Sequence, residues 1–243
     1  MKPHDDETLD TLLRGRLAVL QGKTGYRVSL DAILLARFVT IHETKKILDL
    51  GSGNGPVALM LAALHPTARI VGLELQERMV DRARRSVELN RLWERVEIIA
   101  GDVCHVKQIF PPEYFDLVVS NPPYRAPRSG RLNPDAEKQI ARHEISGGLE
   151  DFLRAGAYVL RKGGTFTAVF PAPRAIDLLA GMRQEVIEPK RLRFVHSVAK
   201  GPASLVLVEG AKEGGKELKV LDPLVVYDDD GKYTPELSAL LGE

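Results

Sequence analysis

The sequence predicts an α/β fold whose sheet is mostly parallel, with helices on both faces and an antiparallel strand at one edge. From residue 45 onward, short apolar runs that are typical of buried strands alternate with longer segments of helical periodicity. A parallel strand reaches its neighbour through a crossover connection, usually a helix, so this alternation indicates a parallel sheet. The last two apolar runs have no helix between them, which predicts an antiparallel pair.

The elements of this sheet follow one another in a regular order. The predicted strands of the parallel part are residues 45–50, 69–74, 96–100, 115–120 and 165–170. The predicted helices between and after them are residues 56–64, 77–90, 152–160 and 175–184. Pro56 stands in the first turn of its helix, where a missing N–H donor is tolerated. Arg161-Lys-Gly-Gly164 predicts a glycine cap at the end of the third helix, and residues 191–198 and 204–208 are the predicted antiparallel pair.

Smaller segments flank the alternating region on both sides. Before residue 45 we predict a hairpin over residues 17–29, with its turn at 22–25, and then a helix over residues 30–39. After residue 210 we predict a flexible connector over 211–217, followed by a short strand, a turn at 228–231 and a terminal helix. The simplest division is a single domain over 1–243, with 1–44 as a leader and 211–243 as an extension.

Composition narrows the class of protein. The 34 Lys and Arg residues nearly balance 33 Asp and Glu, so the net charge of +1 does not indicate a polyanionic partner. Cys104 is the only cysteine, which excludes an internal disulfide and a cysteine-based metal site, and we predict no metal. There is no apolar run of membrane-spanning length and no apolar centre of a signal peptide near Met1, so we predict a cytoplasmic protein without a membrane partner.

A glycine-rich turn joins the first strand of the sheet to the helix that follows. Residues 48–55 are Leu-Asp-Leu-Gly-Ser-Gly-Asn-Gly, and glycine at alternate positions lets the backbone approach a ligand closely. Open α/β sheets bind ligands at this carboxyl edge. Glu74 ends the second strand, 19 residues beyond Gly55, where an acid accepts both hydroxyls of a ribose. Asp102 follows the third strand and is placed to accept from an adenine amino group.

The spacing of these glycines disfavours a dinucleotide and hence an NAD-linked oxidoreductase. The dinucleotide fingerprint is Gly-x-Gly-x-x-Gly, whereas this turn is Gly-x-Gly-x-Gly followed by Pro56. Asp49 adds a negative charge inside the site, which repels phosphate but can orient a nucleoside or a bound amino group. The turn and its three acids therefore predict a nucleoside cofactor.

A second motif closes the fourth strand of the parallel part. Residues 121–124 are Asn-Pro-Pro-Tyr, and the two prolines fix φ and remove two backbone donors, so the strand stops there. Its last carbonyls and the amide oxygen of Asn121 remain as acceptors, and Tyr124 offers a flat face. Such a surface suits a planar nitrogen that bears hydrogens, as in a nucleobase amino group or a side-chain amide.

Basic residues gather in two parts of the chain. The first cluster follows the Asn-Pro-Pro-Tyr motif and consists of Arg125, Arg128, Arg131, Lys138 and Arg142. The second consists of Lys190, Arg191, Arg193, His196 and Lys200. A chain of nearly neutral net charge can still present a positive face to nucleic acid, and the alternative is ordinary solvated surface charge.

Together these motifs resemble the class I S-adenosylmethionine-dependent methyltransferases, and the second motif is similar to that of members that methylate planar amino nitrogens. The resemblance implies a Rossmann-like, mostly parallel seven-stranded sheet with an antiparallel edge strand, and S-adenosylmethionine as cofactor. The implied catalytic residues are Asn121, Pro122, Pro123 and Tyr124. The implied cofactor residues are Ser29, Asp31, Asp49, Gly51, Ser52, Gly53, Asn54, Gly55, Glu74, Leu75, Asp102, Val103 and Asn121. Ser29 and Asp31 are implied at the methionine end, and the alternative is that they only cap a helix.

Three further segments point to the acceptor. Residues 26–36, 140–144 and 222–233 are similar to segments of the bacterial enzymes that methylate the 6-amino group of adenosine 37 in a valine tRNA. The resemblance implies an RNA partner bound through a tRNA anticodon loop, whose phosphates Arg125, Arg128, Arg131 and Arg142 would hold.

Other functions stay open at this point. The same chemistry would serve ribosomal RNA, or a glutamine amide in a translation factor, although the glutamine enzymes carry a longer helical domain than the roughly 45 residues that precede the glycine turn here. DNA is disfavoured because residues 125–147 are too few for a target-recognition domain. A non-catalytic RNA-binding scaffold of this fold would tolerate a damaged motif, but both motifs are intact.

Overall fold

The structure is a computed structural model that describes residues 2–24, 27–41, 45–124 and 147–242. Its main sheet has nine strands in the order β10-β8-β9-β7-β6-β3-β4-β5, and β11 also pairs with β8. The seven predicted strands are present as β3 Lys46–Leu50, β4 Arg69–Glu74, β5 Val96–Ala100, β6 Phe115–Ser120, β7 Leu160–Pro171, β8 Ile187–Val198 and β9 Ala203–Lys212. The predicted fold class is confirmed.

The directions of these strands follow the prediction. Strands β3 to β7 are parallel to their neighbours, whereas β9 is antiparallel to both β7 and β8 and lies between them. The antiparallel strand β9 therefore lies between β7 and β8 and is not itself the edge of the sheet. Because β8 carries the short strands β10 and β11 on its other side, its backbone groups are paired rather than left as an open edge.

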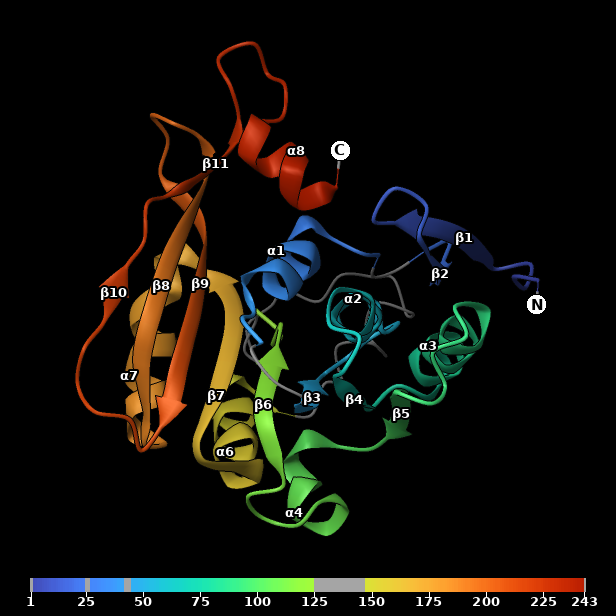
Figure 1. Ribbon diagram of the computed structural model, residues 1–243, viewed down its shortest axis with the longest axis horizontal. Coiled ribbons are helices and arrows are strands. Elements are labelled where there is room, and N and C mark those ends of the chain that lie inside the picture. The colour runs from blue at the N-terminus through green and yellow to red at the C-terminus, as the bar shows by residue number, and fades with distance from the viewer. Residues whose placement is uncertain (1, 25–26, 42–44, 125–146, 243) are drawn as a thin grey trace, which may run out of the picture.

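Helices cover both faces of the main sheet, and each face has its own apolar core (Figure 1). One face carries α1 Leu30–Phe38, α2 Pro56–Leu64 and α3 Glu77–Leu89, and the other carries α4 Val106–Ile109, α6 Leu149–Val159 and α7 Ala175–Gln184. Along β3, Ile47 lies in one core and Leu48 in the other, and both are fully buried. Burial on both faces explains why the central strands are continuous apolar runs. Within the described ranges, no helix is both long and apolar enough to span a membrane.

The hairpin near the start of the chain lies earlier than predicted. It pairs β1 Glu7–Leu12 with β2 Leu17–Gly22, so the prediction of a hairpin over residues 17–29 is wrong. Its turn contains Leu13, Arg14 and Gly15 at φ of 50°, 56° and 77°. β1 lacks the apolar alternation of a half-buried strand, because Glu7 is buried and Leu9 is exposed. The glycine at position 22 gave a false turn signal.

The glycines at 163 and 164 do not cap a helix, so that prediction is also wrong. Helix α6 ends at Val159, Leu160 is extended, and β7 begins there directly. The register against β6 shifts between Phe115 and Leu117, and the two glycines lie in this irregularity. A Cβ added at Gly164 would lie 2.9 Å from the Asp116 carbonyl oxygen, so the close approach of the two strands requires glycine.

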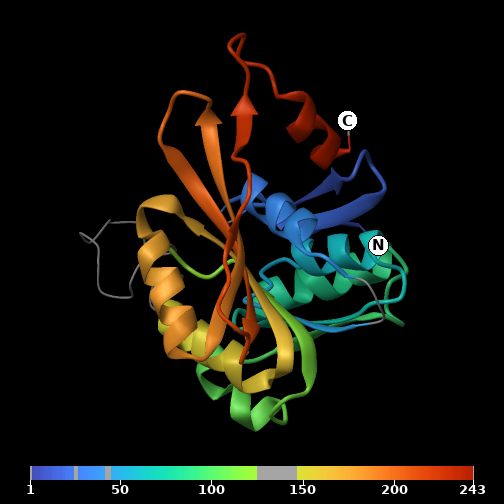
Figure 2. The same ribbon diagram turned by 60° about the vertical axis from the view of Figure 1, so that its left-hand side comes forward.

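The end of the chain is anchored to the domain. It contains β10 Lys219–Val220, β11 Leu224–Tyr227 and α8 Pro235–Leu241, which confirms the predicted strand, turn and helix (Figure 2). Leu237 of α8 is fully buried in the core beside α1, and Arg193 bonds Glu236 at 2.6 Å. The division into one domain with a leader and an extension stays a prediction.

Candidate functional site

The predicted site residues gather at one edge of the sheet because four parallel strands end side by side there. In the register, Leu50 of β3 lies opposite Leu73 of β4 and Ser120 of β6, and Glu74 lies opposite Ala100 of β5. The segments that follow these residues therefore meet at the carboxyl edge. They include the glycine turn, Glu74, Asp102 and the Asn-Pro-Pro-Tyr motif, as the sequence predicts.

The glycine turn is folded tightly against its neighbours. The backbone N–H groups of Gly51 and Ser52 donate to the Leu73 carbonyl oxygen at 2.9 and 3.1 Å. Gly55 has φ of 81°, and a Cβ there would lie 3.1 Å from the Cβ of Ala83 on α3. A side chain at this position would combine backbone strain with a contact tighter than ordinary packing, which explains why glycine occurs there.

Glu74 is fixed beside this turn. Its Oε2 accepts from the Gly53 N–H at 2.8 Å and its Oε1 accepts from the Gln76 N–H at 2.9 Å. Burial raises the pKa of this carboxyl group, since only 7% of the residue is exposed. Two backbone bonds hold the carboxylate in one orientation, and each oxygen keeps acceptor capacity for a ligand.

Asp49 is the most unusual group of the site. It is 2% exposed, and burial, followed by the nearby charge of Glu74, raises its pKa to about 7. The backbone N–H of Ala58, in the first turn of α2, bonds to its carboxylate. Its Oδ2 accepts no hydrogen bond from any residue that the structure describes. A buried carboxylate of this kind suits a cationic or N–H-bearing ligand and opposes phosphate.

Asp102 and its neighbours close the same edge beyond β5. The Asp102 carboxylate accepts from the Cys104 N–H at 2.8 Å and so caps a short 3₁₀ turn over Val103–His105. Val103 is buried and Leu75 half-buried, and their place beside the adenine ring stays a prediction. Ser52 and Asn54, in the glycine turn, are also buried.

The Asn-Pro-Pro-Tyr motif lies next to the glycine turn. The Ser120 hydroxyl donates to the Leu50 carbonyl oxygen at 2.9 Å, which ties the end of β6 to the end of β3. Asn121, the next residue, therefore lies beside Gly51. Asn121 is half-buried and Pro122 is buried, so the motif forms part of the wall at the carboxyl edge and is not a free loop.

Tyr124 contacts a residue that the sequence placed on the cofactor side. Its hydroxyl donates to Oδ2 of Asp31, in the first turn of α1, at 2.5 Å. Its ring meets that of Phe170 edge to face, with centroids 5.8 Å apart. Ser29 occupies the N-cap position of α1, but no side-chain capping bond to the helix is present in the described chain. The role of Ser29 and Asp31 at the methionine end of the cofactor stays a prediction.

Arg174 is a site residue that the sequence did not reveal. It lies in the 3₁₀ turn Ala172–Arg174 after β7, and its Nη1 donates to the Tyr124 carbonyl oxygen at 2.7 Å. The two residues are 50 positions apart, and no motif surrounds Arg174. Only the pairing of β6 with β7 brings them together.

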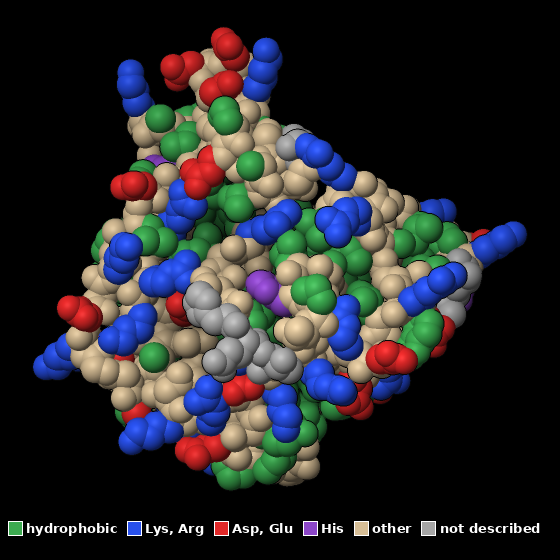
Figure 3. All heavy atoms as spheres, in the orientation of Figure 1, with side chains coloured by type: hydrophobic (Ala, Val, Ile, Leu, Met, Phe, Trp, Pro, Cys, Tyr) green, Lys and Arg blue, Asp and Glu red, His purple; other side chains and the backbone are tan. Residues whose placement is uncertain are grey.

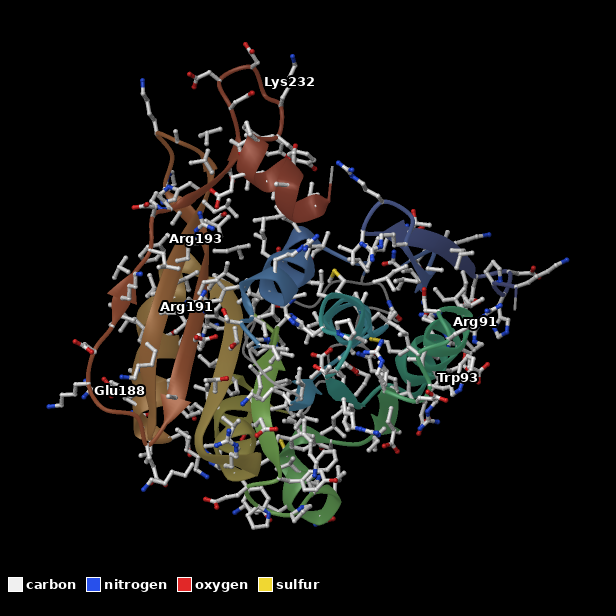
Figure 4. The ribbon with its side chains drawn as sticks, viewed as in Figure 1. Arg91, Trp93, Glu188, Arg191, Arg193 and Lys232 are labelled. Carbon is white, nitrogen blue, oxygen red and sulfur yellow. The ribbon has the colours of Figure 1, made fainter. Side chains whose placement is uncertain are left out.

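The second basic cluster lies on and just after β8, which β9 and β7 separate from β6 in the sheet. Arg191 bonds Glu209 of β9 at 3.2 Å and Thr40 after α1 at 2.8 Å, and Arg193 bonds Glu236 of α8 (Figure 4). Both arginines thus have partners on neighbouring elements. On the face drawn in Figure 3, Lys and Arg side chains are scattered among acidic and apolar ones. The first basic cluster, with Arg125, Arg128, Arg131 and Arg142, lies outside the described residues.

One group of side chains in the described part has the spacing of a metal site. His4, Asp6 and Glu7 offer ligand atoms within 4.8 Å of one another. Hydrogen bonds from Arg85 lower the pKa of Glu7 to about 2, and Arg82 bonds the same carboxylate. Because Arg82 and Arg85 already neutralise Glu7, this group is an ion-pair cluster. The prediction of no metal stays a prediction.

Comparison with known proteins identifies the family. A family model described as the methyltransferase small domain matches residues 28–186. The chain belongs to this methyltransferase family. Its methyl donor is therefore S-adenosylmethionine, and the residues present fit that group. The cofactor carries a sulfonium and an ammonium, which match the buried Asp49, and a ribose, which matches Glu74 beside a turn that only glycines allow.

Curated relatives agree with this family over most of the chain. A protein of Tolumonas auensis is 30% identical over 225 residues, 92% of this chain and 91% of its own. One of Haemophilus influenzae is 30% identical over 216 residues, 88% of this chain and 89% of its own. One of Bacteroides thetaiotaomicron is 36% identical over 157 residues, 64% of each chain. All three are named tRNA1(Val) (adenine(37)-N6)-methyltransferase.

Solved structures show the same fold. A predicted O-methyltransferase of Agrobacterium tumefaciens matches with a TM-score of 0.72 and 24% identity, over 87% of this chain and 95% of the other. The 16S rRNA N2 G1207 methyltransferase of T. Thermophilus, solved with AdoMet and guanosine, matches with a TM-score of 0.57 and 19% identity, over 85% of this chain and 50% of the other. At these identities the likeness concerns the fold alone.

Proposed function

We propose that this chain transfers a methyl group from S-adenosylmethionine to the exocyclic 6-amino group of adenosine 37 in a valine tRNA, in the cytoplasm. The observation that carries the proposal is the position of the Asn121–Tyr124 motif beside the glycine turn. A hydrogen bond from the Ser120 hydroxyl to the Leu50 carbonyl oxygen joins the two segments. Relatives that match about 90% of the chain bear the name of this reaction, which supports the choice of acceptor.

The cofactor side holds the methyl donor through the acids at the strand ends. In this proposal Glu74 accepts the ribose hydroxyls, and Asp102 accepts from the adenine amino group. Asp49 and the turn at residues 51–55 enclose the part that joins the ribose to the methionine. Ser29 and Asp31 line the methionine end, and Leu75 and Val103 pack against the adenine ring. The cofactor supplies a methyl carbon that its sulfonium has already activated.

The acceptor side makes the target nitrogen a better nucleophile. The lone pair of an adenine amino group is delocalised into the ring, so the nitrogen attacks poorly while it stays planar. Asn121 Oδ1 and the Pro122 carbonyl oxygen accept its two hydrogens, and both bonds improve as the nitrogen becomes tetrahedral. With the donor bound, the nitrogen–carbon bond would form as the sulfur–carbon bond breaks, and the methylated nitrogen would then lose one proton to solvent. No separate general base is required.

The base must leave its stack to reach these acceptors. Tyr124 offers an aromatic surface for the displaced base, as enzymes that modify single bases commonly do. An anticodon loop is largely single-stranded, which lowers the free energy needed to expose the base. The arginines at 125, 128, 131 and 142 would hold loop phosphates, so added salt should weaken RNA binding.

Methyl transfer into tRNA tests the proposal directly. Labelled S-adenosylmethionine is incubated with the protein and total tRNA that lacks the modification, and the nucleosides are then analysed by mass spectrometry. We expect label in 6-methyladenosine that maps beside the anticodon of a valine tRNA. If the tRNA carries no label, the incubation is repeated with ribosomal RNA and with a translation factor, and label in either would replace the acceptor and keep the chemistry.

A scaffold without activity is the alternative from another class. It predicts that the protein binds S-adenosylmethionine and RNA but transfers no methyl group to tRNA, ribosomal RNA or protein. That combination of results would overturn the proposed function.

A further inference from the structure

Arg174 makes three interactions, of which one reaches the acceptor motif and one reaches the ring that packs against it. Its Nη1 donates to the Tyr124 carbonyl oxygen at 2.7 Å, and its Nε donates to Asp177 at 2.9 Å. Its guanidinium lies over the ring of Phe170, 5.0 Å from the centroid. The same Phe170 ring packs edge to face against Tyr124. One side chain thus fixes both the backbone of Tyr124 and the ring that supports it.

Tyr124 is held at its other end as well. Its hydroxyl donates to Asp31, 93 residues earlier in the chain, whereas its carbonyl accepts from Arg174, 50 residues later. Helix α1 and the turn after β7 therefore each form a hydrogen bond with Tyr124, from two directions. A tyrosine held at its hydroxyl, its ring and its carbonyl has little freedom to rotate, which sets the direction of its remaining ring surface.

We propose that Arg174 is a positioning residue for methyl transfer, which acts through the Tyr124 carbonyl and the Phe170 ring to hold the acceptor base in line with the methyl group. This inference rests on the proposed function, because it concerns how that acceptor base is held. Arg174 need not touch the base. Loss of the Arg174 contacts with Tyr124 and Phe170 leaves the cofactor side unchanged and lets the acceptor motif move.

The geometry requires arginine in particular. A planar guanidinium donates to the carbonyl from one nitrogen and to Asp177 from another, while its face lies on the Phe170 ring. A lysine ammonium at the same position keeps the charge and one bond to the carbonyl but loses the fork and the stacking surface. Arg174→Lys should therefore restore part of the function that Arg174→Ala removes.

The test compares wild type, Arg174→Ala and Arg174→Lys on valine tRNA. We expect kcat to fall about tenfold in the alanine variant and to recover in part in the lysine variant, since one charged hydrogen bond is lost. The Kd for S-adenosylmethionine and the melting temperature should stay at their wild-type values. Arg183→Ala is the matched control, because Arg183 is an exposed arginine of α7 that pairs with Glu188 at 3.1 Å, and its kcat should be unchanged.

A second readout reports the base itself. A tRNA with 2-aminopurine at the acceptor position changes its fluorescence when the base leaves the stack and rests against Tyr124. In Arg174→Ala the emission of the bound RNA should differ from that of wild type, because the base is no longer held in one place.

The outcomes separate the two proposals. An unchanged kcat and fluorescence in Arg174→Ala would overturn the role of Arg174, as would a joint loss of cofactor affinity and melting temperature. No transfer by the wild-type protein would overturn the proposed function, and this is decided before any variant is compared.

Discussion

The cofactor side of the site is held together by contacts between nearby parts of the chain, whereas the acceptor side depends on segments that are far apart. Glu74 is bonded by a residue 21 positions away and Asp102 by one only two away. Tyr124, in contrast, is held by residues 93 and 50 positions away. The bond to Glu74 forms with the β3–α2–β4 unit and the bond to Asp102 within one turn. The acceptor side also requires α1 and the turn after β7 to be in place.

The two sides also differ in burial. Asp49 and Glu74 are 2% and 7% exposed, and their polar groups are fixed by backbone N–H groups. Tyr124 and Asn121 are half-buried, and the side chain of Arg174 is 39% exposed. The cofactor acids are therefore shielded from solvent, whereas the acceptor side is partly exposed and accessible to a large substrate. Four substitutions test this contrast.

The largest effect is expected on the acceptor side, at the end of β6. Asn121→Ala should lower methyl transfer about 100- to 1,000-fold, because it removes an acceptor whose bond strengthens in the transition state. The Kd for S-adenosylmethionine should hardly change, since the cofactor acids are untouched. Single-turnover rates and calorimetric binding measure the two quantities separately. Equal activity in the variant would remove Asn121 from the mechanism.

The next effect concerns Asp49 and the pH dependence of stability. Burial raises its pKa from 3.8 to about 7, so between these pH values the folded protein keeps a proton that the unfolded chain has lost. This contribution makes the folded state less stable as pH rises through that window. Asp49→Asn cannot ionise, so its stability relative to wild type should increase from pH 4 to pH 8, by at most about 4 kcal/mol.

Denaturant unfolding of Asp49→Asn and wild type at pH 5 and pH 8, without cofactor, measures this difference. Glu77→Gln removes an exposed acid from the first turn of α3 and serves as the control. A stability difference that is the same at both pH values would show that Asp49 has an ordinary pKa.

A smaller effect is expected at the ribose position. Glu74→Gln preserves the size of the side chain but removes its charge, and an amide has one acceptor oxygen in place of two. The Kd for S-adenosylmethionine should rise about tenfold, in line with the loss of one hydrogen bond to a charged group. Glu97→Gln, on an exposed position of β5, should leave the Kd unchanged. Titration calorimetry measures both, and wild-type affinity in Glu74→Gln would exclude this carboxylate as the ribose acceptor.

The smallest effect tests the bond between the two sides. Tyr124→Phe retains the ring but removes the hydroxyl that donates to Asp31, so kcat should fall only a few-fold, the value of one hydrogen bond. When Asp31→Ala is added to Tyr124→Phe, the additional loss should be smaller than the loss from Asp31→Ala alone, because both changes remove the same bond. Strictly additive losses in this double-mutant cycle would show that the two residues act independently.

The sequence revealed the central part of the fold with nearly correct bounds. Strands β3, β4, β5 and β6 were found because burial on both faces makes them continuous apolar runs between helices. The pattern failed where the burial was one-sided or the register irregular. β1 was missed because its polar and apolar residues do not alternate: Glu7 is buried and Leu9 is exposed. The start of β7 was missed because two glycines in a strand irregularity resembled a helix cap.

The candidate site divides in the same way. The glycine turn, Glu74, Asp102 and Asn121–Tyr124 were found from sequence alone, because each depends on local backbone chemistry: positive φ at glycine, an acid at a strand end, and two prolines that end a strand. The tertiary structure alone decided that Asp31 meets Tyr124 and that Arg174 holds its carbonyl. Such contacts depend on which strands pair and how helices pack across the sheet, and these long-range choices leave no local pattern in the chain.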